Sequence, residues 1–240
     1  MKICDLHTHI LPGVDDGAQS LEISLQMLDN AMASDVSHIM VTPHFIPSQT
    51  SVKALADKLN HQFQILQQAA SHLPVELAFG AEVRVTPDLF DHLRTGDIPT
   101  LNASRYLLTE FPMDFKESRF PAVLEKLLEH DYIPLIAHPE RYTAVCHRPD
   151  IVRQWLDMGC HLQLTGSSIQ GNHGKTIQQT AAYLLHQDFV ACVASDAHGV
   201  YGRTNYLMDV YDHLTVHYSQ QYAQYMMYTN PLRIWRNESL

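Results

Sequence analysis

The sequence has no run of 18 consecutive apolar residues, and it has no charged-then-apolar leader followed by a cleavage site. A helix needs about 20 mainly apolar residues to cross a bilayer, and a secretory signal has both of the features that are missing here. We therefore expect no membrane insertion and a cytoplasmic location.

Cationic side chains are scarce. The chain has 16 Lys and Arg against 26 Asp and Glu, which gives a formal net charge of -10 at pH 7. So acidic a protein repels the phosphate backbone of nucleic acids, and we expect no nucleic-acid partner. The same charge disfavours an anionic substrate, unless bound cations reverse the local sign.

Cysteine and linker sequences are also infrequent. The four cysteines, at positions 4, 146, 160 and 192, show no CxxC spacing, so reduced thiols are expected. No Gly/Ser-rich linker and no short repeat divides the chain. With 240 residues, of which 45% are hydrophobic, the chain is long enough for a substantial core. These features predict one domain that spans residues 1–240.

What the sequence does contain is a regular alternation of strand-like and helix-like segments. Apolar residues recur at helical spacing in residues 20–35, where Ser20 is a candidate N-cap, and helical segments follow each later strand. The expected strands are residues 1–6, 37–44, 75–83, 105–111, 132–140, 160–167 and 189–198. Seven strand–helix units predict an α/β fold with a parallel barrel, and an open doubly wound sheet is the second choice.

Polar residues stand where these strands end. The first strand leads into "HTH", whose two histidines point to one side because they lie two positions apart. In a parallel barrel the carboxyl ends of all strands meet on one face, where active sites lie. The residues at these ends are His7, His9, Asp15, Asp16, His44, Glu82, Glu110, His138, Asp196 and His198. They are too many for one ion, and since carboxylates can bridge metals they predict a cluster of two or three. His213 and His217 could share one helix face, but with no third ligand nearby we expect surface histidines there.

Several motifs resemble one known family. "DLHTHILPGVDDGA", "VTPH", "GAEVRVTPD", "LLTEFP", "PLIAHPERY" and "VASDAHGVYGR" are similar to the polymerase and histidinol phosphatase (PHP) superfamily, and most of all to its CpsB/CapC branch of bacterial manganese-dependent protein-tyrosine phosphatases. The resemblance covers residues 1–235 and implies a distorted (β/α)7 barrel with three metal ions. It implies Mn²⁺, with iron, zinc, cobalt or magnesium as alternatives. The implied substrate is the phosphotyrosine-rich tail of a tyrosine kinase that controls capsule or exopolysaccharide synthesis.

The resemblance also implies a ligand set. Its first metal would be held by His7, His9, Glu82 and Asp196. Glu82 would bridge to a second metal, which Glu110 and His138 also bind. The third metal would be held by Asp16, His44 and His198.

Arg141 and Arg203 resemble the family's phosphate-binding arginines, and two guanidinium groups are suited to clamp a phosphoryl group. The alternative for Arg141 is a surface ion pair with Glu140. Some relatives have a second histidine at the position of Phe45. We expect Phe45, "FIPSQT" and "FPMDF" either to form apolar walls for a phenyl ring or to pack beneath the rim.

The expected mechanism is metal-assisted hydrolysis with water as the nucleophile. Its general acid is not identified, and Asp15 or a site histidine are candidates.

The nearest alternative function is a PHP phosphoesterase for a small phosphomonoester such as histidinol phosphate. A metal-dependent amidohydrolase often has a bridging lysine, and no strand here ends in Lys. A cysteine phosphatase needs Arg six positions after its Cys, where Cys146 has Val152. A metal-binding sensor or scaffold is the non-enzyme alternative, and the oligomeric state stays open.

Overall fold

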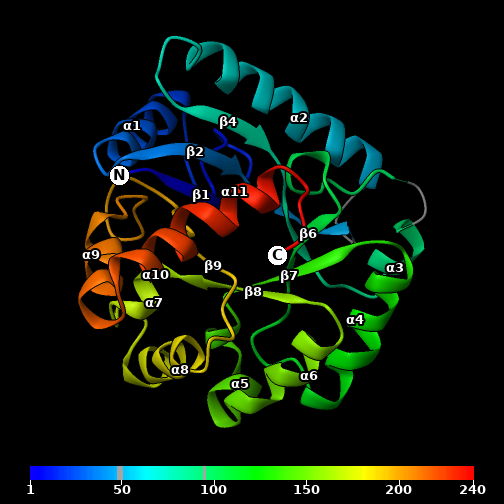
Figure 1. Ribbon diagram of the computed structural model, residues 1–240. Coiled ribbons are helices and arrows are strands. Elements are labelled where there is room, and N and C mark those ends of the chain that lie inside the picture. Colours follow the sequence, from blue (N-terminus) through cyan, green and yellow to red (C-terminus); the bar gives the residue numbers. More distant parts are fainter. Residues whose placement is uncertain (48–50, 94–95) are drawn as a thin grey trace.

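Short parallel strands form the centre of the molecule in a computed structural model, which describes residues 1–47, 51–93 and 96–240 (Figure 1). Helices surround these strands on the outside. Within the described residues the strands are β1 (Ile3–Thr8), β2 (Val36–Val41), β3 (His44–Phe45), β4 (Glu76–Phe79), β5 (Glu82–Arg84), β6 (Tyr106–Glu110), β7 (Ile133–Ala137), β8 (His161–Thr165) and β9 (Cys192–Ala194).

The strands close into a distorted barrel. All strand pairs are parallel, in the orders β1-β2-β4 and β3-β5-β6-β7-β8-β9. β2 continues into β3 across Pro43, and β4 continues into β5. The N–H of Glu82 still donates to the carbonyl of Pro43 at 3.0 Å. At the closure, the N–H of Asp196 donates to the carbonyl of His7 at 2.8 Å, beside a parallel bridge from Thr8 to Ala197. The expected seven-unit barrel is therefore confirmed, and the open sheet is wrong.

Amphipathic helices bury their apolar side against the barrel, as the periodicity predicts. In α1, the Ser20 hydroxyl accepts from the N–H of Ile23 at 3.3 Å, which is the predicted N-cap. The helices of the described residues are α1 (Leu21–Met32), α2 (Val52–Ala69), α3 (Leu89–His92), α4 (Phe120–Glu129), α5 (Thr143–His147), α6 (Val152–Asp157), α7 (Gly166–Ile169), α8 (Lys175–His186), α9 (Met208–His217), α10 (Gln220–Gln224) and α11 (Asn230–Trp235), with a π-helical turn at Tyr225–Thr229. None of the described helices is both long enough and apolar enough to cross a membrane.

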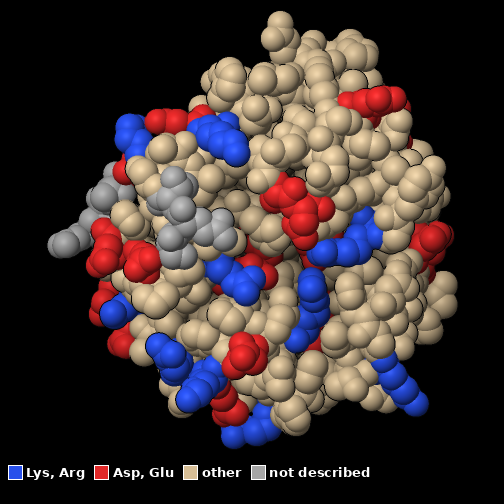
Figure 2. Space-filling model, turned by 180° about the vertical axis from the view of Figure 1, so that it is seen from behind, with Lys and Arg blue, Asp and Glu red and all other residues tan. Residues whose placement is uncertain are grey.

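The C-terminal segment covers the amino ends of the strands. The hydroxyl of Tyr106, at the start of β6, donates to the carbonyl of Glu238 at 2.8 Å, and the N–H of Arg105 donates to Asn237 Oδ1 at 3.0 Å. Figure 1 accordingly shows α11 in front of the barrel. The carboxyl ends of the strands open on the opposite side, which faces the viewer in Figure 2.

Candidate metal centre

His7 and His9 meet two carboxylates inside the barrel mouth. Their Nε2 atoms lie 3.2 Å apart, because alternate residues of β1 and its extension point to the same side. The Nε2 atom of His7 is 3.4 Å from Glu82 Oε1, and both Nε2 atoms are 3.5 Å from Asp196 Oδ1. All four side chains are buried. The strands β1 and β5 and the segment after β9 thus supply one compact group.

His138 and Glu110 extend this group along neighbouring strands. His138 Nε2 lies 2.8 Å from Glu82 Oε1 and 3.9 Å from Glu110 Oε1. Glu82 therefore faces both parts of the cluster. Arg84 Nη1 pairs with Glu110 Oε2 at 2.8 Å, so the second carboxylate oxygen of Glu110 is already held by a cation.

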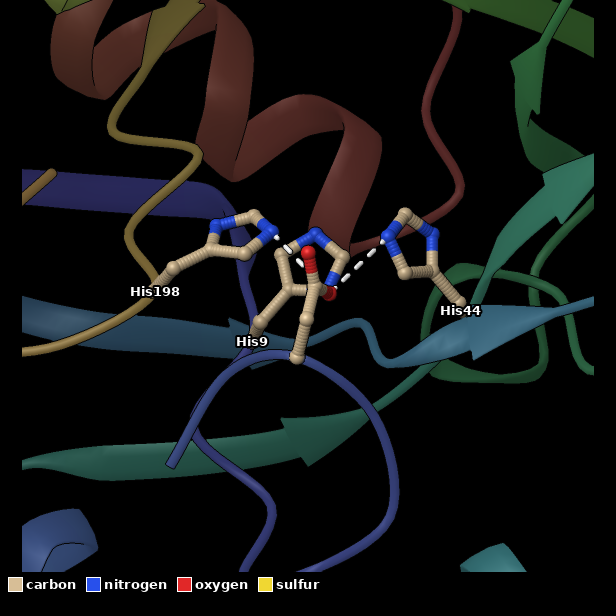
Figure 3. A group of neighbouring side chains, drawn as sticks. His9, His44 and His198 are labelled. Atoms are coloured by element: carbon tan, nitrogen blue, oxygen red, sulfur yellow. Dashed lines mark ion pairs between the residues drawn. The ribbon is translucent and has the colours of Figure 1, made fainter. Parts of the chain in front are cut away.

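The third expected group lies at the mouth of the barrel (Figure 3). His9, His44 and His198 point toward one another there. Asp16 Oδ1 is 3.3 Å from His44 Nε2 and 3.4 Å from His198 Nε2. The other ring nitrogen of His44, Nδ1, lies 2.9 Å from Glu82 Oε2 and so links this group to the buried one. Asp16 is exposed, so the cluster runs from the core to solvent.

All nine expected ligands therefore lie in one connected network. Within the described residues, three sets of ligand atoms have all their members within 4.8 Å of one another. His9, His44 and Glu82 each belong to two of these sets. In the three expected ligand groups, only Glu82 is shared. The three sets are His9–Asp16–His44–His198, His7–His9–Glu82 and His44–Glu82–Glu110.

Gln163 fixes the orientation of the His7 ring. Its amide nitrogen donates to the carbonyl of Leu164 at 2.7 Å, so its Oε1 faces His7 Nδ1 at 2.9 Å as an acceptor. The proton of a neutral His7 then sits on Nδ1, and the lone pair of Nε2 faces the cluster.

Asp15 does the same for His9. Its Oδ2 lies 2.9 Å from His9 Nδ1 and accepts the N–H of His44 at 3.0 Å, while its Oδ1 accepts the N–H of Gly17 at 2.9 Å. Burial raises the pKa of Asp15, but the His9 hydrogen bond and these N–H donors lower it to about 2. A carboxyl with this pKa is ionised at neutral pH, which argues against Asp15 as the general acid.

These contacts test whether a cation fits. With Nδ1 of both rings committed as a donor, the Nε2 lone pairs of neutral His7 and His9 face each other at 3.2 Å, where no hydrogen bond between them is available. Burial lowers the pKa of His7, but Glu82 and Asp196 hold it above its usual value. Burial raises the pKa of Asp196, and the surrounding histidines nevertheless keep it well below its usual range. The site thus favours positive charge, and its oxygen and imidazole donors suit divalent transition metals.

Two members of the cluster have strained backbones. His138 has φ 36° and Asp196 has φ 52°, in the left-handed region that residues with a Cβ avoid. His138 directly follows β7 and Asp196 stands two residues after the end of β9, and both side chains face the cluster. Strain of this kind costs about 1–3 kcal/mol and occurs most often at functional sites.

Arg141 and Arg203 converge on one atom. Arg141 Nη1 lies 2.9 Å from Asp196 Oδ2, and Arg203 Nη2 lies 2.7 Å from the same oxygen. Both side chains are partly exposed, at 20% and 33%. Glu140 is fully buried and accepts the N–H of Thr165 at 3.0 Å. The alternative of a surface Arg141–Glu140 pair is therefore wrong.

Phe45 requires a correction. Its side chain has no exposed surface and belongs to the hydrophobic core, because it points away from the mouth next to His44. It is packed beneath the rim and does not line the site. Residues 48–50 of "FIPSQT" lie outside the described residues. Of "FPMDF", Phe111 is buried, whereas Phe115 is half-buried.

Sequence reasoning missed Arg84 and Gln163. Arg84 stands two residues after Glu82 in the last position of β5, and this spacing along a strand was the available signal. Gln163 lies inside β8, where nothing in the sequence sets it apart. The rings of His213 and His217 lie 4.3 Å apart on α9, tilted to each other, and belong to none of the three ligand sets.

The comparisons with known proteins agree on one family. Residues 3–236 match the family described as "Capsular polysaccharide synthesis, CpsB/CapC". The tyrosine-protein phosphatase CpsB of Streptococcus pneumoniae is 33% identical over 237 residues, which covers 96% of this chain and 97% of that protein. The tyrosine-protein phosphatase YwqE of Bacillus subtilis is 28% identical and covers 98% of this chain and 92% of its own length.

Solved structures show the same likeness. A chain from the crystal structures of YwqE from B. subtilis and CpsB from S. pneumoniae, described as unique metal-dependent tyrosine phosphatases, superimposes with a TM-score of 0.85 at 28% identity, over 99% of this chain and 96% of that one. The lactonase Lmo2620 of Listeria monocytogenes, at 12% identity, covers 98% of this chain and 94% of its own, with a TM-score of 0.63. It shares the fold.

Proposed function

The chain belongs to the CpsB/CapC family, and we propose on that premise that it is a metal-dependent phosphoric monoester hydrolase that removes phosphate from phosphotyrosine in proteins. The observation that carries this proposal is the network of histidines and carboxylates at the barrel mouth, with Arg141 and Arg203 meeting at its edge. We propose that residues 1–240 act as a single PHP phosphoesterase domain.

We propose that the cluster holds three divalent cations. The ligands would be His7, His9, Glu82 and Asp196 for the first, Glu82, Glu110 and His138 for the second, and Asp16, His44 and His198 for the third. Mn²⁺ is the proposed ion, as the family resemblance implies, and iron, zinc, cobalt and magnesium are the alternatives. When bound, such ions supply Lewis acidity, which withdraws charge from phosphoryl oxygens and makes water more acidic.

The arginines bind and orient the phosphate. Their N–H groups already converge on one carboxylate oxygen, Asp196 Oδ2, so a phosphoryl oxygen beside it can replace that contact. Guanidinium groups hold phosphate oxygens through paired hydrogen bonds and stabilise the charge that develops in the transition state. The leaving tyrosinate, whose parent pKa is ~10, needs only modest protonation.

A protein thiol is not needed as the nucleophile. Cys4, Cys160 and Cys192 are buried, and Cys146 donates its thiol hydrogen to the carbonyl of Glu140 at 3.1 Å. Burial raises the pKa of each of these four thiols. Water is therefore the proposed nucleophile.

The proposed substrate is a phosphotyrosine-bearing bacterial tyrosine kinase that controls capsule or exopolysaccharide synthesis in the cytoplasm. The family description and the phosphatase names of the relatives support this choice. A small phosphomonoester such as histidinol phosphate is the alternative, since the same cluster could act on it.

Steady-state kinetics on four substrates distinguishes a protein-tyrosine phosphatase from a phosphoesterase for small molecules. The substrates are p-nitrophenyl phosphate, a phosphotyrosine peptide, a phosphoserine peptide of the same sequence and histidinol phosphate, each tested after chelation and readdition of single metals. We expect kcat/KM to favour phosphotyrosine over phosphoserine by about tenfold, or about 1.4 kcal/mol. Preference for histidinol phosphate would establish the alternative.

A further inference from the structure

A hollow of about 550 Å³ lies directly beyond the carboxyl ends of β5 and β6. Its walls are mainly apolar and aromatic, and they come from the loop after β5 with α3, from the loop after β6 and from the start of α4. They include Val85, Phe90, Pro112, Phe115 and Val123. Phe90 and Phe115 are half-buried, and Lys126 Nζ lies over the ring of Phe90 at 4.7 Å.

Residues that line this hollow follow residues of the candidate metal centre closely in the sequence. Val85 directly follows Arg84, and its N–H donates to the carbonyl of Glu110 at 2.8 Å. Pro112 stands two residues after Glu110. The strand ends that carry the cluster residues thus pass straight into the walls of the hollow, on the same face of the barrel.

Two uncompensated cations line the hollow. Lys116 and Arg119 are exposed, and neither has an ion-pair partner among the residues that the structure describes. Arg119 lies over the ring of Phe115 at 5.5 Å. The neighbouring Glu117 is already paired with Arg148 at 3.1 Å. Asp114 is the one acidic residue among those that line the hollow.

Positive charge here is unusual for a chain with a formal net charge of -10. On the face that Figure 2 shows, Lys and Arg side chains are interspersed with Asp and Glu side chains. A ligand that enters here meets apolar walls and cations together. A peptide segment that carries apolar side chains and carboxylates complements the apolar walls and the cations.

We propose that this hollow binds the segment that flanks phosphotyrosine in the substrate protein. An apolar side chain of that segment fills the space between Phe90, Phe115 and Val123, and its acidic side chains pair with Lys116 and Arg119. This inference rests on the proposed phosphatase function and adds the chemical class of its substrate, an acidic phosphotyrosine segment with an apolar residue near the phosphotyrosine.

Kinetics on two peptides and one small substrate tests the proposal. One phosphotyrosine peptide has flanking Asp and Leu, the other has Ser and Gly in their place, and p-nitrophenyl phosphate reaches only the phosphate site. In the double variant Lys116→Glu, Arg119→Glu, kcat/KM on the acidic peptide should fall about tenfold, mainly through KM. Activity on p-nitrophenyl phosphate should change by less than about twofold, since no flanking segment is present.

Two further variants sharpen the result. Lys53→Glu, Lys58→Glu makes the same charge change on the exposed side of α2 and should leave the acidic peptide unaffected. Val123→Phe narrows the hollow and should reduce the preference for the peptide with Asp and Leu over the peptide with Ser and Gly. Equal losses in both double variants, or no loss in either, would overturn the proposal.

A binding measurement distinguishes a failure of the proposed peptide-binding hollow from a failure of the proposed phosphatase function. The acidic peptide, with a non-hydrolysable phosphonate in place of phosphate, is titrated by fluorescence anisotropy against the wild type and the Lys116→Glu, Arg119→Glu variant. Weaker binding by the variant supports the hollow even if the enzyme fails to turn over any phosphotyrosine peptide, a failure that would overturn only the proposed function. Equal binding by both proteins would overturn the hollow alone.

Discussion

Single side chains around the cluster decide whether its ligands face inward. Gln163 and Asp15 are not among the expected metal ligands, yet each accepts from the Nδ1 atom of one histidine at 2.9 Å. Partners of this kind set the tautomer and the ring orientation of metal-binding histidines. Their effect should therefore appear in metal affinity before it appears in folding.

Asp15→Asn tests this role. The amide keeps the shape of the carboxyl but loses its charge and one acceptor, so His9 is held less firmly. We expect metal affinity to fall about 10–100-fold, measured by competition with a chelating dye. Asp57→Asn, on the exposed side of α2, is the matched control and should have wild-type affinity. Unchanged affinity in Asp15→Asn would show that His9 needs no such support.

The pKa of Asp15 adds a pH dependence. Its folded pKa of about 2 lies below the usual value of 3.8, so the ionised form stabilises the fold above the usual value and this stability is lost as pH falls toward 2. A shift of this size corresponds to about 2 kcal/mol. In urea unfolding of the metal-free protein, the wild type should exceed Asp15→Asn in stability at pH 6, and the difference should shrink between pH 4 and pH 3. A constant difference would contradict this.

Glu82 contacts four histidines of the cluster. It faces His7, His9, His44 and His138 at 2.8–3.4 Å. Glu82→Ala or His138→Ala should nearly abolish turnover and lower bound metal by elemental analysis. His213→Ala, which changes a histidine on α9, should do neither. A Glu82 variant with its full metal content would refute the proposed bridge.

At the scale of elements, the loop after β1 is shaped by one close approach. A Cβ on Gly17 would lie 2.0 Å from the backbone oxygen of His9, so only glycine allows this loop to fold back over the histidine. The fold-back brings Asp15 to His9 and Asp16 to the mouth. Loop conformation and metal affinity are therefore coupled here.

Gly17→Ala should separate this loop from the cluster. Because the new methyl group collides with backbone, the loop must shift, and both metal affinity and thermal stability should fall. Gly199→Ala is the control, since it also lies beside a cluster residue but its Cβ would meet no atom closer than 4.0 Å. Calorimetry with and without Mn²⁺ measures both effects. Equal behaviour of the two variants would contradict the expected coupling.

The sequence predicts elements better than it predicts the directions of side chains. Alternating strands and helices give the barrel, and polar residues at strand ends give the cluster, because both follow from chain periodicity and parallel topology. Phe45 was misplaced because a two-residue strand after Pro43 does not show which neighbour of His44 faces the mouth. Gln163 looks like any strand residue until the barrel closes. The left-handed backbone of His138 and Asp196 does not follow from residue type alone, because Asp and His adopt it more often than most residues with a Cβ but still uncommonly.

Over the whole molecule, function depends on charge gathered at one end of the barrel. The C-terminal segment covers the amino ends of the strands, so the opposite end is left for the cluster, the two arginines and the hollow beside them. Buried carboxylates are costly without compensating charge. Bound cations should therefore stabilise the fold as well as support catalysis.

Chelation and thiol alkylation should consequently have opposite outcomes. Removal of metal should abolish phosphatase activity and lower the melting temperature, and Mn²⁺ should restore both, since a ligand at 100 times its Kd stabilises a protein by about 2.7 kcal/mol. Iodoacetamide at neutral pH should leave activity intact, because Cys4, Cys160 and Cys192 are buried and burial raises the pKa of Cys160 to about 12. Activity and melting temperature are measured on the same samples, with mass spectrometry to count alkylated thiols. Full activity after chelation, or inactivation that parallels alkylation, would replace the metal mechanism with a thiol one.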